Sequence, residues 1–219
     1  MVRSNFERGL TELHNELINM GAMVKEAIEN SIKAFMASDF ELCRAIIAGD
    51  KAVDDKEKQI ESKCLWLIAR EQPIASDLRL ITTALKITTD MERIGDHASD
   101  IAELTMRIPE KNIFSENEHI HLMAKAAVEM VGDAITAYLG SDLPLAKATE
   151  VKDDAVDDYF NLIKREIAEV FATNAEKTDN AIDFLLIAKY LERIADHAVN
   201  ICEWVRFSQT GEHKNTLIF

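Results

Sequence analysis

An all-α fold of two tandem antiparallel three-helix bundles is predicted by an internal repeat, by the spacing of apolar residues and by the scarcity of turn residues. The twelve residues from Glu92 to Glu103 recur 100 positions later, from Glu192 to Glu203, with eight identical. Apolar residues lie alternately three and four apart over long stretches, as in helices packed nearly parallel. No segment alternates with period two for long enough to predict a sheet. Only seven Gly and three Pro occur in 219 residues, which suits long helices.

The first two helices are predicted from apolar periodicity and from their ends. Residues 6–27 carry an unbroken apolar stripe. Asp39 is a suitable N-cap for a second helix that runs to about Arg70, with Gly49 as a candidate break. Pro73 ends this helix, because a proline disfavours helical geometry in the residue before it.

The third helix of the first half is predicted to start at Ser76 or Asp77, either of which can cap it. Its apolar stripe extends to Ile101, and Ile108-Pro109 stops it. The duplication therefore predicts a first three-helix bundle over residues 1–108 and a second over residues 109–219.

The second half repeats this order. A stripe over residues 120–138 is followed by a turn at 140–144, which contains Gly, Ser, Asp and Pro. A fifth helix follows over residues 156–170, and a break at 174–178 separates it from a sixth helix over residues 184–205.

Charge and composition exclude several classes of protein. The net charge of −14 argues against nucleic-acid binding, which needs clustered Lys and Arg. Cys43, Cys64 and Cys202 fit no metal-ligand spacing and are expected to be core thiols in a reducing compartment. Without a signal peptide or a long apolar span, the chain is expected to be cytoplasmic.

Acidic residues four apart form a repeated pattern. On a helix with 100° per residue, Glu92, Asp96 and Asp100 share one face, pointing away from the apolar stripe. Asp50 and Asp54 of the preceding helix share a face too, and they return 103 positions later as Asp153 and Asp157. Each bundle is thus predicted to carry acids on two neighbouring helices.

Two interpretations of these acids stay open at the level of sequence. They form either a solvated acidic face or a site for cations, since stacked like charges destabilise a helix and a bound cation would relieve that repulsion. Carboxylate oxygens suit Mg²⁺, Mn²⁺, Ca²⁺ or iron. His97 and His197 lie on the flank of the column, as interface histidines or as ligands or proton carriers.

Three segments carry a family resemblance. Residues 72–79 read QPIASDLR, residues 90–98 read DMERIGDHA, and residues 191–201 read LERIADHAVNI. With the duplicated E(D)xxxD pattern and the total length, these segments resemble the PhoU family of phosphate-signalling proteins over nearly the whole chain. The resemblance implies a regulator and not a catalyst, with a multinuclear metal cluster on each bundle, iron being the expected metal. The ligands it implies are Asp50, Asp54, Glu92, Asp96 and Asp100 in the first cluster, and Asp153, Asp157, Glu192, Asp196 and Asn200 in the second.

The same resemblance implies partners. Family members act as negative regulators of the phosphate-starvation response and limit phosphate uptake. They link a phosphate-specific ABC transporter, through its ATPase subunit, to a phosphate-sensing histidine kinase. The chain is accordingly expected to be peripheral to the membrane through its partners, with a homodimer as a candidate assembly. Because Asn200 replaces Asp100 in the second copy, the two clusters need not be equivalent.

Three other functions are compatible with parts of the sequence. A di-iron carboxylate enzyme needs Glu-x-x-His on two helices, and here Glu116-x-x-His119 and Glu118-x-x-His121 lie in one segment. A phosphotransfer module would use His97 or His197 as the phosphoacceptor. A structural adaptor would bind basic partners through its acidic faces without metal.

Overall fold

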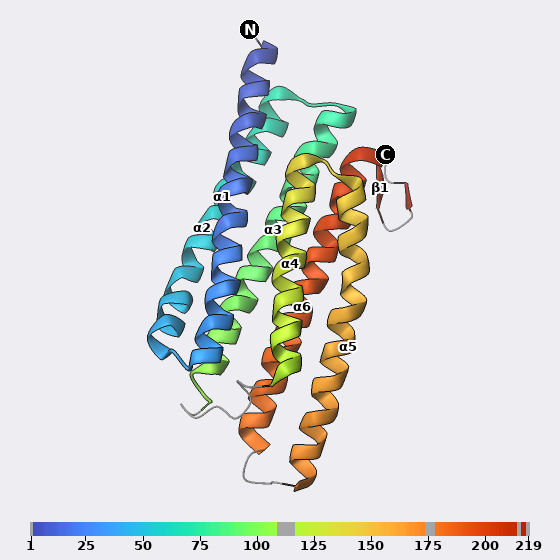
Figure 1. Ribbon diagram of the computed structural model, residues 1–219. Helices are drawn as coiled ribbons and strands as arrows, with labels where there is room; N and C mark the ends of the chain where they lie inside the picture. Colours follow the sequence, from blue (N-terminus) through green and yellow to red (C-terminus); the bar gives the residue numbers. More distant parts are fainter. Residues whose placement is uncertain (1, 109–116, 174–177, 214–215, 218–219) are drawn as a thin grey trace.

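The computed structural model describes residues 2–108, 117–173, 178–213 and 216–217, and within these residues the chain forms six long helices (Figure 1). A pair of strands with two residues each follows the last helix, and the sequence did not indicate these strands. The all-α prediction is confirmed. The elements are α1 (Val2–Ala37), α2 (Phe40–Glu71), α3 (Ala75–Thr105), α4 (Glu118–Gly140), α5 (Leu143–Thr173), α6 (Thr178–Thr210), β1 (Glu212–His213) and β2 (Thr216–Leu217).

The turns after α1 and α4 have the same geometry, 103 residues apart. Ser38 and Ser141 adopt left-handed backbone conformations with φ of 51° and 52°. The Asp39 side chain accepts a hydrogen bond from the Leu42 N–H at 3.0 Å, and the Asp142 side chain accepts one from Leu145, also at 3.0 Å. The predicted cap at Asp39 is confirmed, and its repetition fixes the alignment of α1–α2 with α4–α5.

Two details of the first half differ from the sequence-based expectation. Gly49 does not break α2, because the neighbouring Ile46 and Val53 are buried and hold the helix against the core. Helix α3 begins at Ala75, before the expected caps, and the Asp77 N–H donates to the Ile74 carbonyl at 3.1 Å. A backbone hydrogen bond thus takes the place of the expected side-chain cap.

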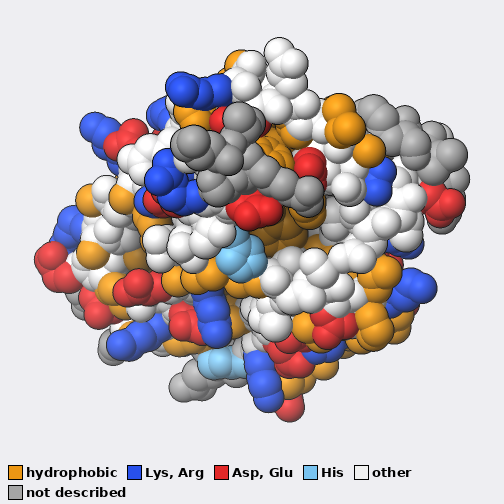
Figure 2. Space-filling model, turned by 90° about the horizontal axis from the view of Figure 1, so that it is seen from above, with side chains coloured by type: hydrophobic (Ala, Val, Ile, Leu, Met, Phe, Trp, Pro, Cys, Tyr) orange, Lys and Arg blue, Asp and Glu red, His pale blue; other side chains and the backbone are white. Residues whose placement is uncertain are grey.

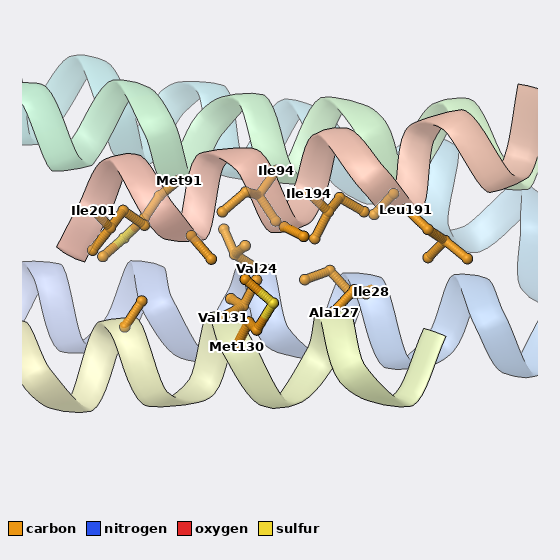
Figure 3. Packing of buried hydrophobic residues seen from close by; sticks show 14 of the residues in the cluster. Val24, Ile28, Met91, Ile94, Ala127, Met130, Val131, Leu191, Ile194 and Ile201 are labelled. Atoms are coloured by element: carbon orange, nitrogen blue, oxygen red, sulfur yellow. The ribbon is translucent and has the colours of Figure 1, made fainter. Parts of the chain in front are cut away.

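The two sets of three helices share one hydrophobic core. Helix α3 packs on α6 and α1 packs on α4, whereas α2 and α5 contact only helices of their own half (Figure 1). Buried residues of the four inner helices point toward one another, among them Val24 of α1, Val131 of α4, Ile94 of α3 and Ile194 of α6 (Figure 3). The division at residue 108 stays a prediction, and Pro109 lies outside the described residues.

The surface mixes both signs of charge. At the end of the molecule that carries the α2–α3 and α4–α5 turns, Lys and Arg side chains lie among Asp and Glu (Figure 2). None of the described helices has the length and apolar character needed to cross a membrane.

Candidate metal site

Four acids of the first half lie close together where α2 packs on α3, and we call them the first column. Asp50 and Asp54 come from α2, and Glu92 and Asp96 from α3. One carboxylate oxygen each of Asp50, Asp54 and Asp96 lies within 4.8 Å of the others. The spacing of four places each pair on one helix face, and the antiparallel packing of α2 on α3 brings the two faces together.

The first column is only partly accessible to solvent. Glu92 exposes 15% of its side chain and Asp96 30%. The acids point away from the core, as expected. They face a neighbouring helix, however, and do not form a freely solvated surface.

This environment raises the pKa of two carboxyl groups. Burial, together with the nearby charges of Asp96 and Asp54, raises the pKa of Asp50 to about 6. Burial and the charge of Asp96 raise the pKa of Glu92 to about 7. Both shifts arise because desolvation and like charges disfavour the ionised form.

Arg93, the cation beside the first column, does not provide a hydrogen bond to every carboxylate oxygen of the column. Arg93 donates to Asp96 at 3.0 Å, and its Nε lies 3.4 Å from Oε2 of Glu92. The latter contact lacks hydrogen-bond geometry, so Glu92 Oε2 is buried without a hydrogen bond. A buried acceptor of this kind is costly unless another group, such as a cation, binds it.

The second column consists of Asp153 and Asp157 from α5 and Glu192 and Asp196 from α6. Burial and the charges of Asp196 and Asp157 raise the pKa of Asp153 to about 6. Burial and Glu192 likewise raise the pKa of Asp196. Lys189 Nζ forms an ion pair with Oε2 of Glu192, a buried oxygen that has no hydrogen bond.

Asp100 and Asn200, the remaining expected ligands, contact residues of the interface between α3 and α6. Asn200 Nδ2 donates to Asp90 at 3.4 Å. Asp100 Oδ2 lies 3.4 Å from Nδ1 of His97, while its charge also contributes to the raised pKa of Asp50. Their role as ligands stays a prediction.

The two histidines of the repeat lie at the same interface. The rings of His97 and His197 are 5.6 Å apart, and Nδ1 of His197 is 2.8 Å from Asp90 Oδ1. Burial lowers the pKa of His97. This position fits the expectation of interface histidines.

Asp90 and Lys189 were not identified from sequence. Asp90 aligns with Tyr190 and Lys189 with Thr89, so both are positions where the duplication has diverged. That divergence was the available signal, but it does not show that Asp90 pairs with a residue 107 positions away.

The Glu-x-x-His segments do not converge in the bundle interior. His119 Nδ1 lies 2.6 Å from Glu166 Oε1, which ties the start of α4 to α5. Glu118 and His121 are exposed, and Glu116 lies outside the described residues. The described residues therefore do not form the inward-facing ligand set of a di-iron enzyme.

The chemistry of the donors fits a hard cation. Each column is made of carboxylates. The first includes a buried glutamate oxygen with no hydrogen bond, and the equivalent oxygen of the second is paired with Lys189. All three cysteines are buried, and burial raises the pKa of Cys64 and Cys202 to about 12, which disfavours their thiolate forms.

Comparison with known proteins identifies the family. A family model described as the PhoU domain matches twice, at residues 17–105 and 120–205. A protein of Clostridium acetobutylicum named "Phosphate-specific transport system accessory protein PhoU homolog" is 38% identical, covering 97% of each chain. The homologue of the same name from Streptococcus pneumoniae is 30% identical, over 96% of this chain and 98% of its own.

Solved structures show the same architecture. The crystal structure of the phosphate transport system regulatory protein PhoU from Streptococcus pneumoniae superposes with a TM-score of 0.89 at 30% identity, covering 98% of this chain and 99% of the other. That of PhoU from Pseudomonas aeruginosa gives 0.87 at 28% identity, covering 94% of this chain and all of the other. The Clostridium acetobutylicum and Streptococcus pneumoniae relatives are named accessory or regulatory proteins, in agreement with the expectation of a regulator. With matched helices, matched repeats and near-complete coverage, the chain belongs to the PhoU family.

Proposed function

We propose that this protein is a cytoplasmic accessory regulator of a phosphate-specific transport system, limiting phosphate uptake and repressing the phosphate-starvation response when phosphate is plentiful. The names of relatives that cover nearly the whole chain support the transport role. The proposed partners are the ATPase subunit of the ABC transporter and a phosphate-sensing histidine kinase. A homodimer remains a further prediction.

The proposal includes a multinuclear metal cluster on each column, with iron as the expected metal and Mg²⁺, Mn²⁺ or Ca²⁺ as the other hard cations. The observation that carries this is the duplicated column itself. In the first half, one carboxylate oxygen each of Asp50, Asp54 and Asp96 lies within 4.8 Å of the others, and Oε2 of Glu92 is buried without a hydrogen bond. In the second half, the charges of Asp196, Asp157 and Glu192 all act on Asp153, although Asp157 and Asp196 are exposed.

A bound cation would change the electrostatics of both columns. It would offset the burial and the repulsion that raise the pKa of Asp50 and Asp153, and it would link α2 to α3 and α5 to α6. The outer helices would then be held in place for partner binding.

Elemental analysis of protein purified without chelator tests the metal sites. The double variants Glu92→Ala/Asp96→Ala and Glu192→Ala/Asp196→Ala are each expected to lose the metal of one column. Matched controls are Asp55→Asn and Asp158→Asn, exposed acids next to the columns on α2 and α5, which should retain it. Wild-type protein without metal would refute the clusters.

A transcriptional reporter for the phosphate-starvation response tests the regulatory role. Deletion of the gene is expected to raise the reporter in high phosphate, and wild-type protein should restore repression. An unchanged reporter contradicts the role. If both column variants repress as well as wild type, regulation does not need metal and the metal-free acidic adaptor becomes the better interpretation.

A further inference from the structure

The first half has a cavity at the place where the second half has a lysine side chain. The cavity lies between α1 and α2, beside the start of the first column, and has a volume of about 330 Å³. This size is at the lower end of small-ligand pockets. Glu26 and Asn30 of α1 and Gly49 of α2 line it, along with the apolar side chains of Leu42, Ile46 and Val53.

The duplication shows what occupies the equivalent place in the second half. The matched turns set an offset of 103, which aligns Gly49 with Lys152. The Lys152 ammonium lies 2.5 Å from Glu129 and 2.8 Å from Asp133, which hold it against α4. At the same offset, Glu26 aligns with Glu129 and Asn30 with Asp133. The first half thus keeps two acceptors and lacks the lysine that binds them.

At a second position that lines the cavity, the first half also has a smaller side chain than the second half. Ala27 aligns with Met130, which is fully buried in the second half. The cavity therefore arises where two side chains of the second half, one long and cationic and one large and apolar, are replaced by Gly and Ala.

We propose that this cavity binds a lysine side chain from a protein partner, through its ammonium group and its aliphatic stem. Glu26 and Asn30 accept hydrogen bonds from the ammonium, as their counterparts do from Lys152. Leu42 and Ile46 cover the methylene groups, in the way that long cationic side chains commonly pack.

Three observations favour a partner lysine. Among the described residues, none forms an ion pair or a hydrogen bond with the Glu26 side chain. The lining also includes Asp50, an acid of the first column, but the remaining walls are mostly apolar, which suits the methylene stem of a lysine better than a hydrated metal ion. The net charge of −14 attracts basic segments, and a compact ammonium suits two acceptors that lie four residues apart on one helix face. The proposal does not depend on metal binding.

Titration with blocked lysine, Nα-acetyl-L-lysine N-methylamide, followed by NMR of the full chain, tests the site. Saturable shifts in α1 and α2 are expected with a Kd on the order of millimolar, as for a small fragment. The Nε-acetylated form, which has no charge, should bind at least about tenfold more weakly. Glu26→Gln should weaken binding of blocked lysine by a similar factor. No saturable shift, or equal binding of the acetylated form, overturns the proposal.

Refilling the cavity gives an independent test. A Cβ at Gly49 would meet nothing within 4 Å, so both Gly49→Lys and Gly49→Ala are sterically permitted. Gly49→Ala removes only the helix cost of glycine and should raise the Tm by about 2–4 °C. Gly49→Lys should raise the Tm further and abolish binding of blocked lysine, whereas Gly49→Ala should still bind it. Unchanged lysine binding by Gly49→Lys overturns the proposal.

Spermidine distinguishes a partner lysine from a free polyamine. Blocked lysine should bind at least as tightly as spermidine if the site is built for one side chain. Spermidine binding about tenfold more tightly, and lost in Gly49→Lys, overturns the assignment to a protein partner in favour of a free polyamine.

Discussion

The first and second columns have the same acids in the same order but different cations beside them. In the first, Arg93 donates to Asp96, and position 89 is a threonine. In the second, Lys189 takes the place of that threonine and pairs with Glu192. The second half also keeps Lys152 bound to two acids of α4, where the first half has Gly49 and a cavity.

This difference shows which part of the duplicated site was retained. The carboxylates stayed, although burial and mutual repulsion raise the pKa of Asp50 and Asp153, so that their ionised forms destabilise the metal-free fold. The surrounding cations diverged, so the second half compensates more of its negative charge internally. We therefore expect the first half to respond more strongly to cations from outside.

Truncation of the shared core should affect both halves equally, and it has the largest expected effect. Ile94 and Ile194 are fully buried and meet in one core. Ile94→Ala and Ile194→Ala should each lower the free energy of unfolding by roughly 2–5 kcal/mol. Thermal unfolding should remain a single transition, as expected for halves that unfold together. Two separated transitions would contradict the shared core.

Neutralising one glutamate of each column should change the free energy of unfolding differently in the two halves. Burial raises the pKa of Glu92 to about 7 from 4.5, so the folded state binds more protons and loses stability as pH rises from 4.5 to 7. In metal-free protein at pH 8, Glu92→Gln should stabilise by about 1–2 kcal/mol after allowance for solvent screening. At pH 4 the gain should vanish.

Glu192→Gln is the matched control for that experiment. It removes the partner of Lys189 and should give no stabilisation at pH 8. Denaturant unfolding at both pH values measures the four differences. Equal gains in the two variants would mean that Lys189 does not offset the charge of Glu192.

Exchanging the residues at positions 89 and 189 should make the charge balance of one column resemble that of the other. Lys189→Thr removes the cation and is expected to destabilise metal-free protein by about 1 kcal/mol, the upper range for a partly exposed ion pair. Thr89→Lys should stabilise metal-free protein by a smaller amount. Calorimetry of both variants, before and after addition of Mn²⁺, is the measurement. Stabilisation by Mn²⁺ should increase for Lys189→Thr, and a decrease would count against a cation site in the second column.

The smallest effect is expected at the interface of α3 and α6. Asn200→Asp restores the acid of the first copy but places it beside Asp90, which now accepts a hydrogen bond from Asn200. We expect a loss of roughly 0.5 kcal/mol at pH 8, the size of a like-charge pair on a helix. The reverse change, Asp100→Asn, should be tolerated. A gain in stability for Asn200→Asp without metal would show that the two interfaces are more alike than their contacts indicate.

Most of the fold could be predicted from local sequence features. Apolar spacing gave the helices, and Asp39 and Pro73 gave two of their ends. Gly49 was misjudged because the cost of glycine in a helix is about 1 kcal/mol, less than the burial of its neighbours contributes. The strand pair after α6 has two residues per strand, too few for periodicity to detect.

The candidate site was predicted less completely. Helical geometry placed Glu92 with Asp96 and Asp50 with Asp54, because residues four apart share a face. It could not show that these acids would be half-buried, nor that Asn200 would contact Asp90. Such contacts join helices far apart in sequence and depend on how α3 and α6 are rotated against each other.

The sequence by itself determined the six helices, the duplication and the acids of both columns, because helix periodicity and identical repeats are properties of the chain read locally. The tertiary structure decided that Asp50, Asp54 and Asp96 converge, that Lys189 compensates only the second column, and that Gly49 leaves a cavity beside Glu26. These features depend on side chains from different helices meeting at one place, and the packing of the shared core sets those meetings.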